Sequence, residues 1–306
     1  MAPSNEAEGR RAKPTLKHLF YLTRPYSWVC STAVAVAAWL LAGGAAQLLG
    51  LWIPLLLSAL LWVGLNWLSD SIQRDAGRTP PSRTLVTIVV VASLGFAAFF
   101  SASAFVWAGI HYALVLAYAQ KKVSPKVGAI SYLFRGGTVF AACAAASAAA
   151  NGAWSPTGDA FWFIASQSLA HAARNLIGDI RDMKDDRYEL LATHGATRAA
   201  MVAVACLLAA GVAAAMLTVL RRETISFVVV LLIGVFLLIR YGGRIGYEKA
   251  GRRLHHVMVV AFSIFTLYCS FHLGVWWLWV VLGSAFLVAL HRTYKDNPGK
   301  GYRGNF

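Results

Sequence analysis

Charged residues are scarce in this sequence, and acidic residues are the scarcest of them. Only 13% of the 306 residues are Asp, Glu, Lys or Arg, whereas soluble domains carry about a quarter. Just 13 residues are acidic, and 58% are hydrophobic. The mean hydropathy is +0.58. This composition argues against an ordinary soluble domain and predicts a polytopic membrane protein.

Cysteine is also rare, and the patterns of several common chemistries are missing. The four cysteines lie inside apolar runs without CxxC spacing: Cys30, Cys143, Cys206 and Cys269. They are typical of small buried hydrophobes and imply neither a metal site nor a disulfide framework. The sequence shows no nucleophile triad, Gly-rich phosphate loop, haem pair or zinc spacing.

Positive charge is the one abundant charge, with a net value of +15. The basic residues lie between hydrophobic runs and not along one soluble face. The positive-inside rule accounts for this distribution. We therefore expect the lipid bilayer, and no nucleic acid, among the partners.

The hydrophobic runs predict an all-α bundle of nine or ten transmembrane helices. A disordered basic arm is expected over 1–17, a membrane domain over 18–292 and a cytoplasmic tail over 293–306. The predicted spans lie at roughly 28–48, 51–69, 84–103, 104–119, 128–150, 158–178, 198–219 and 224–240, with one or two more within 255–291. Placing the N-terminus inside puts nearly all basic connections on the cytoplasmic side of the cytoplasmic membrane, with Arg221-Arg222 as the exception.

The most acidic stretch is RNLIGDIRDMKDDRYE, residues 174–189, which follows a predicted span. Five of the 13 acidic residues fall here. On a helix, one face would carry the oxygen-bearing side chains of Asn175, Asp179, Asp182 and Asp186. Like charges gathered on one face repel each other, so this face needs cations against it. Mg2+ is suited to it, since it takes one or two carboxylates plus phosphate oxygens.

A second copy of the pattern lies earlier in the chain. Asn66 and Asp70 have the same Asn-x-x-x-Asp spacing as Asn175 and Asp179, and each pair closes the second helix of a group of four. One such pair alone could be a helix cap or a solvated loop face. Two copies predict a paired metal–phosphate site, with two four-helix halves around a central cavity.

At these residues the sequence resembles the UbiA superfamily of intramembrane prenyltransferases. The segments that carry the resemblance are NWLSDSIQRD with AGRTPPSRTL, RNLIGDIRDMKDDR, the opening LTRPYSW and the basic loop of residues 121–126. The first motif departs from the family pattern at two positions: Trp67 stands where the family often has Asp, and Asp75 comes one residue late. The second motif follows the pattern more fully.

The resemblance implies Mg2+-dependent transfer of a prenyl group from an isoprenyl diphosphate to a small aromatic or lipid acceptor. Such an enzyme is a transferase of alkyl groups other than methyl, active in isoprenoid biosynthesis. The implied metal ligands are Asn66, Asp70, Asp179, Asp182 and Asp186, and the implied catalytic residues are Asp70, Asp179 and Asp182. The implied substrate-binding residues are Lys121, Lys122, Arg135, Arg174 and Asn175.

Other readings of these residues and of the whole chain stay open. The loop lysines can simply set topology, and Arg135 can extend its charge to the membrane surface. The allylic cation expected after diphosphate loss calls for aromatic faces, which the chain offers near the motifs at Trp62, Trp67, Tyr118, Tyr132, Phe134 and Phe161. A membrane terpene cyclase acting without an acceptor and a transporter are the alternative functions.

Overall fold

A computed structural model describes residues 25–73, 81–120, 124–181, 190–219 and 221–246, and separately 254, 273–275, 277, 280–281, 283–285 and 288. The helices are α2 (Pro25–Leu41), α3 (Leu48–Gln73), α4 (Arg83–Phe100), α5 (Ala102–Ala119), α6 (Pro125–Asn151), α7 (Gly158–Arg181), α8 (Leu190–Ala215) and α9 (Arg221–Ile245). Every regular element in these ranges is a helix, as predicted. The basic arm, the C-terminal tail and most of the last hydrophobic stretch lie outside the described residues.

Each of the first eight predicted spans corresponds to one helix. Six of these helices are long and apolar enough to cross a membrane: α3, α4, α5, α6, α8 and α9. The protein is therefore an integral, multi-pass membrane protein. Helix α7 misses this criterion because its second half carries polar and charged side chains, including those of the acidic motif. Helix α2 contributes a shorter apolar segment, Ser31–Leu41.

Local sequence signals set several helix ends. The side chain of Ser82 accepts a hydrogen bond from the backbone of Leu85 and begins α4. Ser101 ends α4 and begins α5, so a single residue links these helices. Helix α2 ends at Leu41, earlier than predicted, because the chain turns through Gly43 at a φ of 85°.

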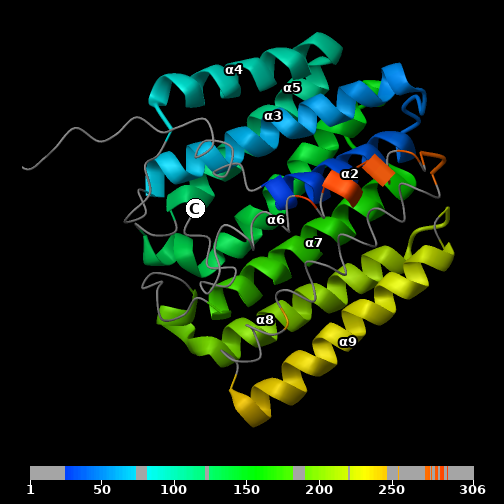
Figure 1. Cartoon of the computed structure of the whole chain (residues 1–306). Coiled ribbons are helices and arrows are strands. Elements are labelled where there is room, and N and C mark those ends of the chain that lie inside the picture. The colour runs from blue at the N-terminus through cyan, green and yellow to red at the C-terminus, as the bar shows by residue number, and fades with distance from the viewer. Residues whose placement is uncertain are drawn as a thin grey trace, which may run out of the picture.

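Helix α6 lies at the centre of the described bundle. It packs against α2, α3, α4, α5, α7 and α8. Figure 1 shows α4 at one edge of the bundle and α9 at the opposite edge. Many of the apolar side chains on these two edge helices are exposed, as expected of surfaces that face lipid.

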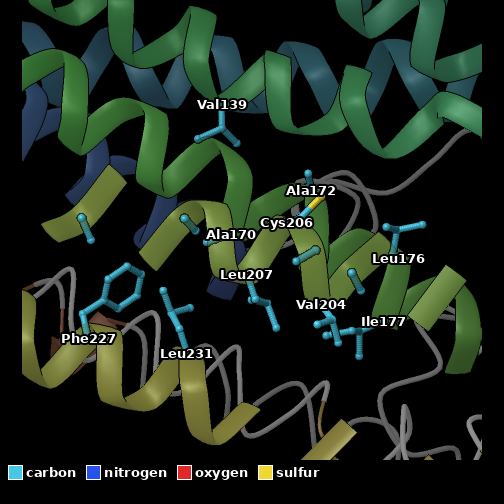
Figure 2. Packing of buried hydrophobic residues seen from close by; sticks show 14 of the residues in the cluster. Val139, Ala170, Ala172, Leu176, Ile177, Val204, Cys206, Leu207, Phe227 and Leu231 are labelled. Carbon is cyan, nitrogen blue, oxygen red and sulfur yellow. The ribbon is translucent and has the colours of Figure 1, made fainter. Parts of the chain in front are cut away.

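Helices α7, α8 and α9 share one buried core, seen in Figure 2. Leu207 of α8 lies between α7 and the side chains of Phe227 and Leu231 on α9. Small residues, such as Ala170 and Ala172, allow the helix backbones to approach closely.

The contact between α6 and α7 is especially close at one glycine. A Cβ atom added to Gly136 would lie 2.8 Å from the backbone oxygen of Ser168. The hydroxyl of Ser168 donates to the carbonyl of Gly136 at 2.7 Å. This contact fixes α6 against α7 directly beside Arg135.

Candidate functional site

The two Asn-x-x-x-Asp pairs lie near the C-terminal ends of α3 and α7. Asn66 is 2% exposed, Asp70 is 6% exposed and Asp179 is 7% exposed. Helices α3 and α7 each pack against α2 and α6. The two polar helix ends thus share neighbouring helices, and side chains from α5 and α6 connect them.

Arg135 of α6 is the first of these connecting residues. Its guanidinium lies 5.0 Å from the ring centroid of Trp62 on α3 and 5.5 Å from that of Tyr118 on α5. These distances are within the range of cation–π contacts. The side chain is only 7% exposed, so it turns into the bundle and does not extend to the membrane surface.

Tyr118 carries the connection to the second motif. Its hydroxyl donates to Asn175 Oδ1 at 3.3 Å, and Asn175 Nδ2 donates to Asp179 Oδ2 at 3.1 Å. The Asn175 amide thus accepts a hydrogen bond from Tyr118 on α5 and donates one to the Asp179 carboxylate on its own helix, α7. This arrangement fixes the orientation of Asp179 relative to α5.

Asn66 is oriented by its own helix. Its Nδ2 donates to the carbonyl of Trp62, one turn earlier, at 2.9 Å. Trp62 therefore contacts both Asn66, through its backbone, and Arg135, through its ring. A continuous series of contacts runs from the first motif through Trp62, Arg135 and Tyr118 to the second motif, which places both motifs at the same end of the bundle.

Arg174 lies one residue before the second motif and is half-buried. Its Nη1 atom donates to Nε2 of His171 at 3.2 Å. The guanidinium is thus directed back along α7, toward the turn that precedes the motif. Together with Arg135 it brings positive charge to a region that also holds Asp70 and Asp179.

The donor atoms at this end of the bundle suit a hard cation. They are carboxylate and amide oxygens, which Mg2+ prefers. Within the described residues no three His, Cys, Asp or Glu side chains form a metal-binding group. The predicted ligands Asp182 and Asp186 lie outside the described residues, as do Lys121 and Lys122.

Ring contacts distinguish three of the six aromatic residues expected near the motifs. Trp62 and Tyr118 lie at the site, where the structure adds a role that the sequence did not indicate, the contact with Arg135. Phe161 lies at the other end of α7, where its ring packs 5.1 Å from Trp162 and 6.3 Å from Phe140. Its expected position near the motif is therefore wrong.

Two further polar residues of α7 precede the second motif: His171, which the sequence suggests could line the cavity, and Gln167, for which no role was predicted. Gln167 and His171 precede Asn175 by eight and four positions and are buried. The sequence signal that could have drawn attention to both residues is their spacing, because they continue the four-residue period of Asn175 and Asp179 toward the N-terminus of α7.

Comparisons with known proteins identify the fold. No protein-family model and no curated protein matches the sequence. Among solved structures, a UbiA homologue from Archaeoglobus fulgidus matches with a TM-score of 0.64 and 14% identity, over 84% of this chain and 99% of its own. A structure described for digeranylgeranylglyceryl phosphate synthase matches with a TM-score of 0.63 and 13% identity, over 82% of this chain and 98% of its own.

A third structure is that of the Archaeoglobus fulgidus homologue bound to GPP and Mg2+. It matches with a TM-score of 0.58 and 13% identity, over 82% of this chain and 99% of its own. The chain therefore has the fold of the UbiA homologues. The resemblance inferred from the two acidic motifs is confirmed at the level of the fold.

Proposed function

We propose that the protein is a Mg2+-dependent prenyltransferase, which moves a prenyl group from an isoprenyl diphosphate to a small aromatic or lipid acceptor. One observation carries the proposal: the two Asn-x-x-x-Asp pairs are joined across the bundle through Arg135 and Tyr118. A homologue of the same fold binds GPP, a prenyl diphosphate, together with Mg2+. Both ligands suit the oxygen-rich and cationic groups at this end of the bundle.

The metal would be held by the side-chain oxygens of the two motifs. These are Asn66 and Asp70 on α3, Asp179 on α7, and Asp182 and Asp186 beyond the described end of α7. Bound Mg2+ neutralises the diphosphate and so makes it a better leaving group. The hydrogen bond from Asn175 holds the Asp179 carboxylate in place for this purpose.

The cationic side chains would bind the remaining diphosphate oxygens. Arg135 is fixed by two aromatic rings and Arg174 by His171, so both guanidinium groups are positioned before the substrate arrives. Lys121 and Lys122 are assigned the same role from the sequence. In the reaction, the C–O bond to the diphosphate breaks, the acceptor forms a bond to the allylic carbon, and the acceptor loses a proton.

The orientation of the site is also part of the proposal. The alternation of the predicted spans puts nearly all the basic connections at the same end of the bundle as the motifs. The positive-inside rule then places the site at the cytoplasmic face of the cytoplasmic membrane. A water-soluble diphosphate headgroup would approach from this side while the prenyl chain stays in the bilayer.

Diphosphate release from the purified full-length protein tests the proposal. The assay combines donors from C10 to C50 with phenolic and glycerol-lipid acceptors, with Mg2+ and with EDTA. A prenyltransferase releases diphosphate only with Mg2+ and yields a prenylated acceptor. A hydrocarbon or terpene alcohol formed without acceptor would identify a cyclase, and flux across vesicles without diphosphate release would identify a transporter; either result would overturn the proposal.

A further inference from the structure

Polar side chains on α7 continue into the membrane beyond the motif. Counting back from Asp179 in steps of four gives Asn175, His171 and Gln167. Residues four apart are about 40° apart around a helix, so Gln167 and His171 share one face, while Gln167 lies about 120° around the helix from Asp179. Gln167 is 2% exposed and His171 is 8% exposed, so both are buried inside the protein.

The Gln167 amide nitrogen is buried and, in the part of the chain that the structure describes, has no hydrogen-bond partner. Gln167 lies near the middle of α7 and is enclosed by protein, so its amide N–H is out of reach of bulk water. Buried donors without a partner are unfavourable and uncommon, and each one calls for an explanation. A ligand that supplies an acceptor oxygen would satisfy the amide.

The equivalent position in the first half of the chain lacks this feature. Ser58 precedes Gln167 by the same number of residues that separates Asn66 from Asn175. Its hydroxyl lies 3.2 Å from Thr32 Oγ1 and 3.1 Å from the carbonyl of Leu55. The polar group of the first half is therefore satisfied within the protein.

In the second half, the position that matches Thr32 carries no hydroxyl. The residue that corresponds to Thr32 is Ala141, and a methyl group has no acceptor atom. The two halves thus have the same residues at the Asn and Asp positions of the motifs. About two turns before these motifs they have different residues, Ser58 in the first half and Gln167 in the second. Among the described residues, only the second half presents an amide donor there without a partner.

His171 presents a second donor on the same side of α7. An arginine side chain can only donate, so His171 Nε2 must accept the hydrogen bond from Arg174. The proton of the neutral ring then lies on Nδ1. The backbones of His171 and Gln167 are about 6 Å apart along the helix axis, and each residue carries a side-chain N–H donor.

We propose that Gln167 and His171 bind the oxygen atoms of the prenyl acceptor. This inference rests on the proposed transferase function and narrows its acceptor to a molecule with hydroxyl or carbonyl groups. At a rise of 1.5 Å per residue, Gln167 lies about 18 Å and His171 about 12 Å from Asp179 along α7. Gln167 is thus too far from the motif to contact a diphosphate held there, and the prenyl chain has no oxygen to offer.

Binding of matched probes to the full-length protein in nanodiscs tests the subsite. One pair is hydroquinone and p-xylene, which share a ring but differ in oxygen. The other pair is 1-O-hexadecylglycerol and hexadecane, which separates a lipid acceptor from an aromatic one. We expect one oxygen-bearing probe to raise the Tm of the wild-type protein, with no effect of its hydrocarbon match; no difference within either pair would overturn the inference.

Gln167→Leu and the matched control Ser58→Ala complete the test. Gln167→Leu removes the amide but keeps the size, so we expect loss of the probe effect and an unchanged or higher Tm without probe. Ser58→Ala should retain the probe effect and have a lower Tm, because it loses a satisfied hydrogen bond. Probe binding by Gln167→Leu equal to wild type, or a lower Tm without probe, would show that the amide is structural.

Turnover separates this inference from the proposed function. We expect Gln167→Leu to raise the acceptor KM by about two- to twelve-fold, the effect of one neutral hydrogen bond, and to leave the donor KM unchanged. No diphosphate release by the wild-type protein would reject the transferase, while the probe measurement would still decide on the subsite. Normal release together with an unchanged acceptor KM in Gln167→Leu would reject the subsite alone.

Discussion

The Ser147 hydroxyl donates to the carbonyl of Ala38 at 3.2 Å, across 109 positions of the chain. Asn151 Nδ2 donates to the carbonyl of Ala42 at 3.3 Å, across the same separation. Asn66 and Asn175 of the two motifs are also 109 positions apart. One interval therefore relates the contacts between α2 and α6 to the spacing of the motifs.

This shared interval supports an internal repeat. When residues at equivalent positions of two repeats contact each other, they lie close to the axis that relates the repeats. Helices α2 and α6 are the first helices of the two predicted halves, and they pack together near the middle of the bundle. The motif-bearing helices α3 and α7 follow them, one in each half, which accounts for the similar placement of the two acidic ends.

Asp70→Ala and Asp179→Ala should each lower diphosphate release by roughly a hundred-fold or more. Removing even the outer partners of metal ligands costs 10–100-fold, so loss of a ligand should cost at least as much. We expect the folded yield to stay near that of the wild type, because gathered carboxylates repel each other. Release assays over a Mg2+ titration measure the effect, and wild-type rates in both variants would place the metal site elsewhere.

Asp159→Ala is the control for these variants and a prediction in its own right. Asp159 lies in the first turn of α7, at the end opposite the motif, and accepts hydrogen bonds from Thr218 N, Thr218 Oγ1 and Val219 N at 2.8–3.0 Å. Removing the Asp159 carboxylate breaks its hydrogen bonds to the turn before α9 and should lower the free energy of unfolding by about 1–2 kcal/mol. We expect a lower Tm with unchanged diphosphate release. An unchanged Tm would mean that these bonds contribute nothing measurable.

The sequence predicted helix positions better than contacts between helices. Hydrophobic runs identified eight helices because membrane thickness sets their length. The four-residue spacing correctly indicated that each Asn lies one helical turn from an Asp, Asn66 from Asp70 and Asn175 from Asp179. The direction of Arg135 could not be predicted, since it depends on how α6 is rotated toward Trp62 and Tyr118. Such rotations follow from packing, here the close approach at Gly136.

Tyr118→Phe should raise the Mg2+ concentration needed for half-maximal activity by up to about ten-fold. The substitution removes the hydroxyl that donates to Asn175 and keeps the ring that faces Arg135. Tyr118→Leu removes both, so it should raise the donor KM as well. Steady-state assays that vary Mg2+ and donor separately measure the two effects. An equal response of both variants to Mg2+ and to donor would show that the hydroxyl has no separate role.

Arg135→Ala should raise the donor KM by about ten- to a hundred-fold, the effect of a charge-assisted hydrogen bond worth about 1.5–3 kcal/mol. Arg135→Lys should fall between the wild type and Arg135→Ala, because a lysine keeps the charge but loses the planar group that lies over the rings of Trp62 and Tyr118. Trp62→Leu should then raise the donor KM less than Arg135→Ala, since it removes one support of the guanidinium and leaves its charge.

Arg222→Ala is the matched control for the Arg135 series. Arg222 is exposed in the first turn of α9, at the end away from the motifs. Its loss changes the net charge equally and should leave the donor KM unchanged. Donor titrations at fixed Mg2+ compare the four variants. If Arg135→Ala and Arg222→Ala have the same donor KM, the buried guanidinium supports the fold and does not bind diphosphate. If Arg135→Lys restores the wild-type value, charge alone is sufficient and the stacking on Trp62 and Tyr118 does not contribute to binding.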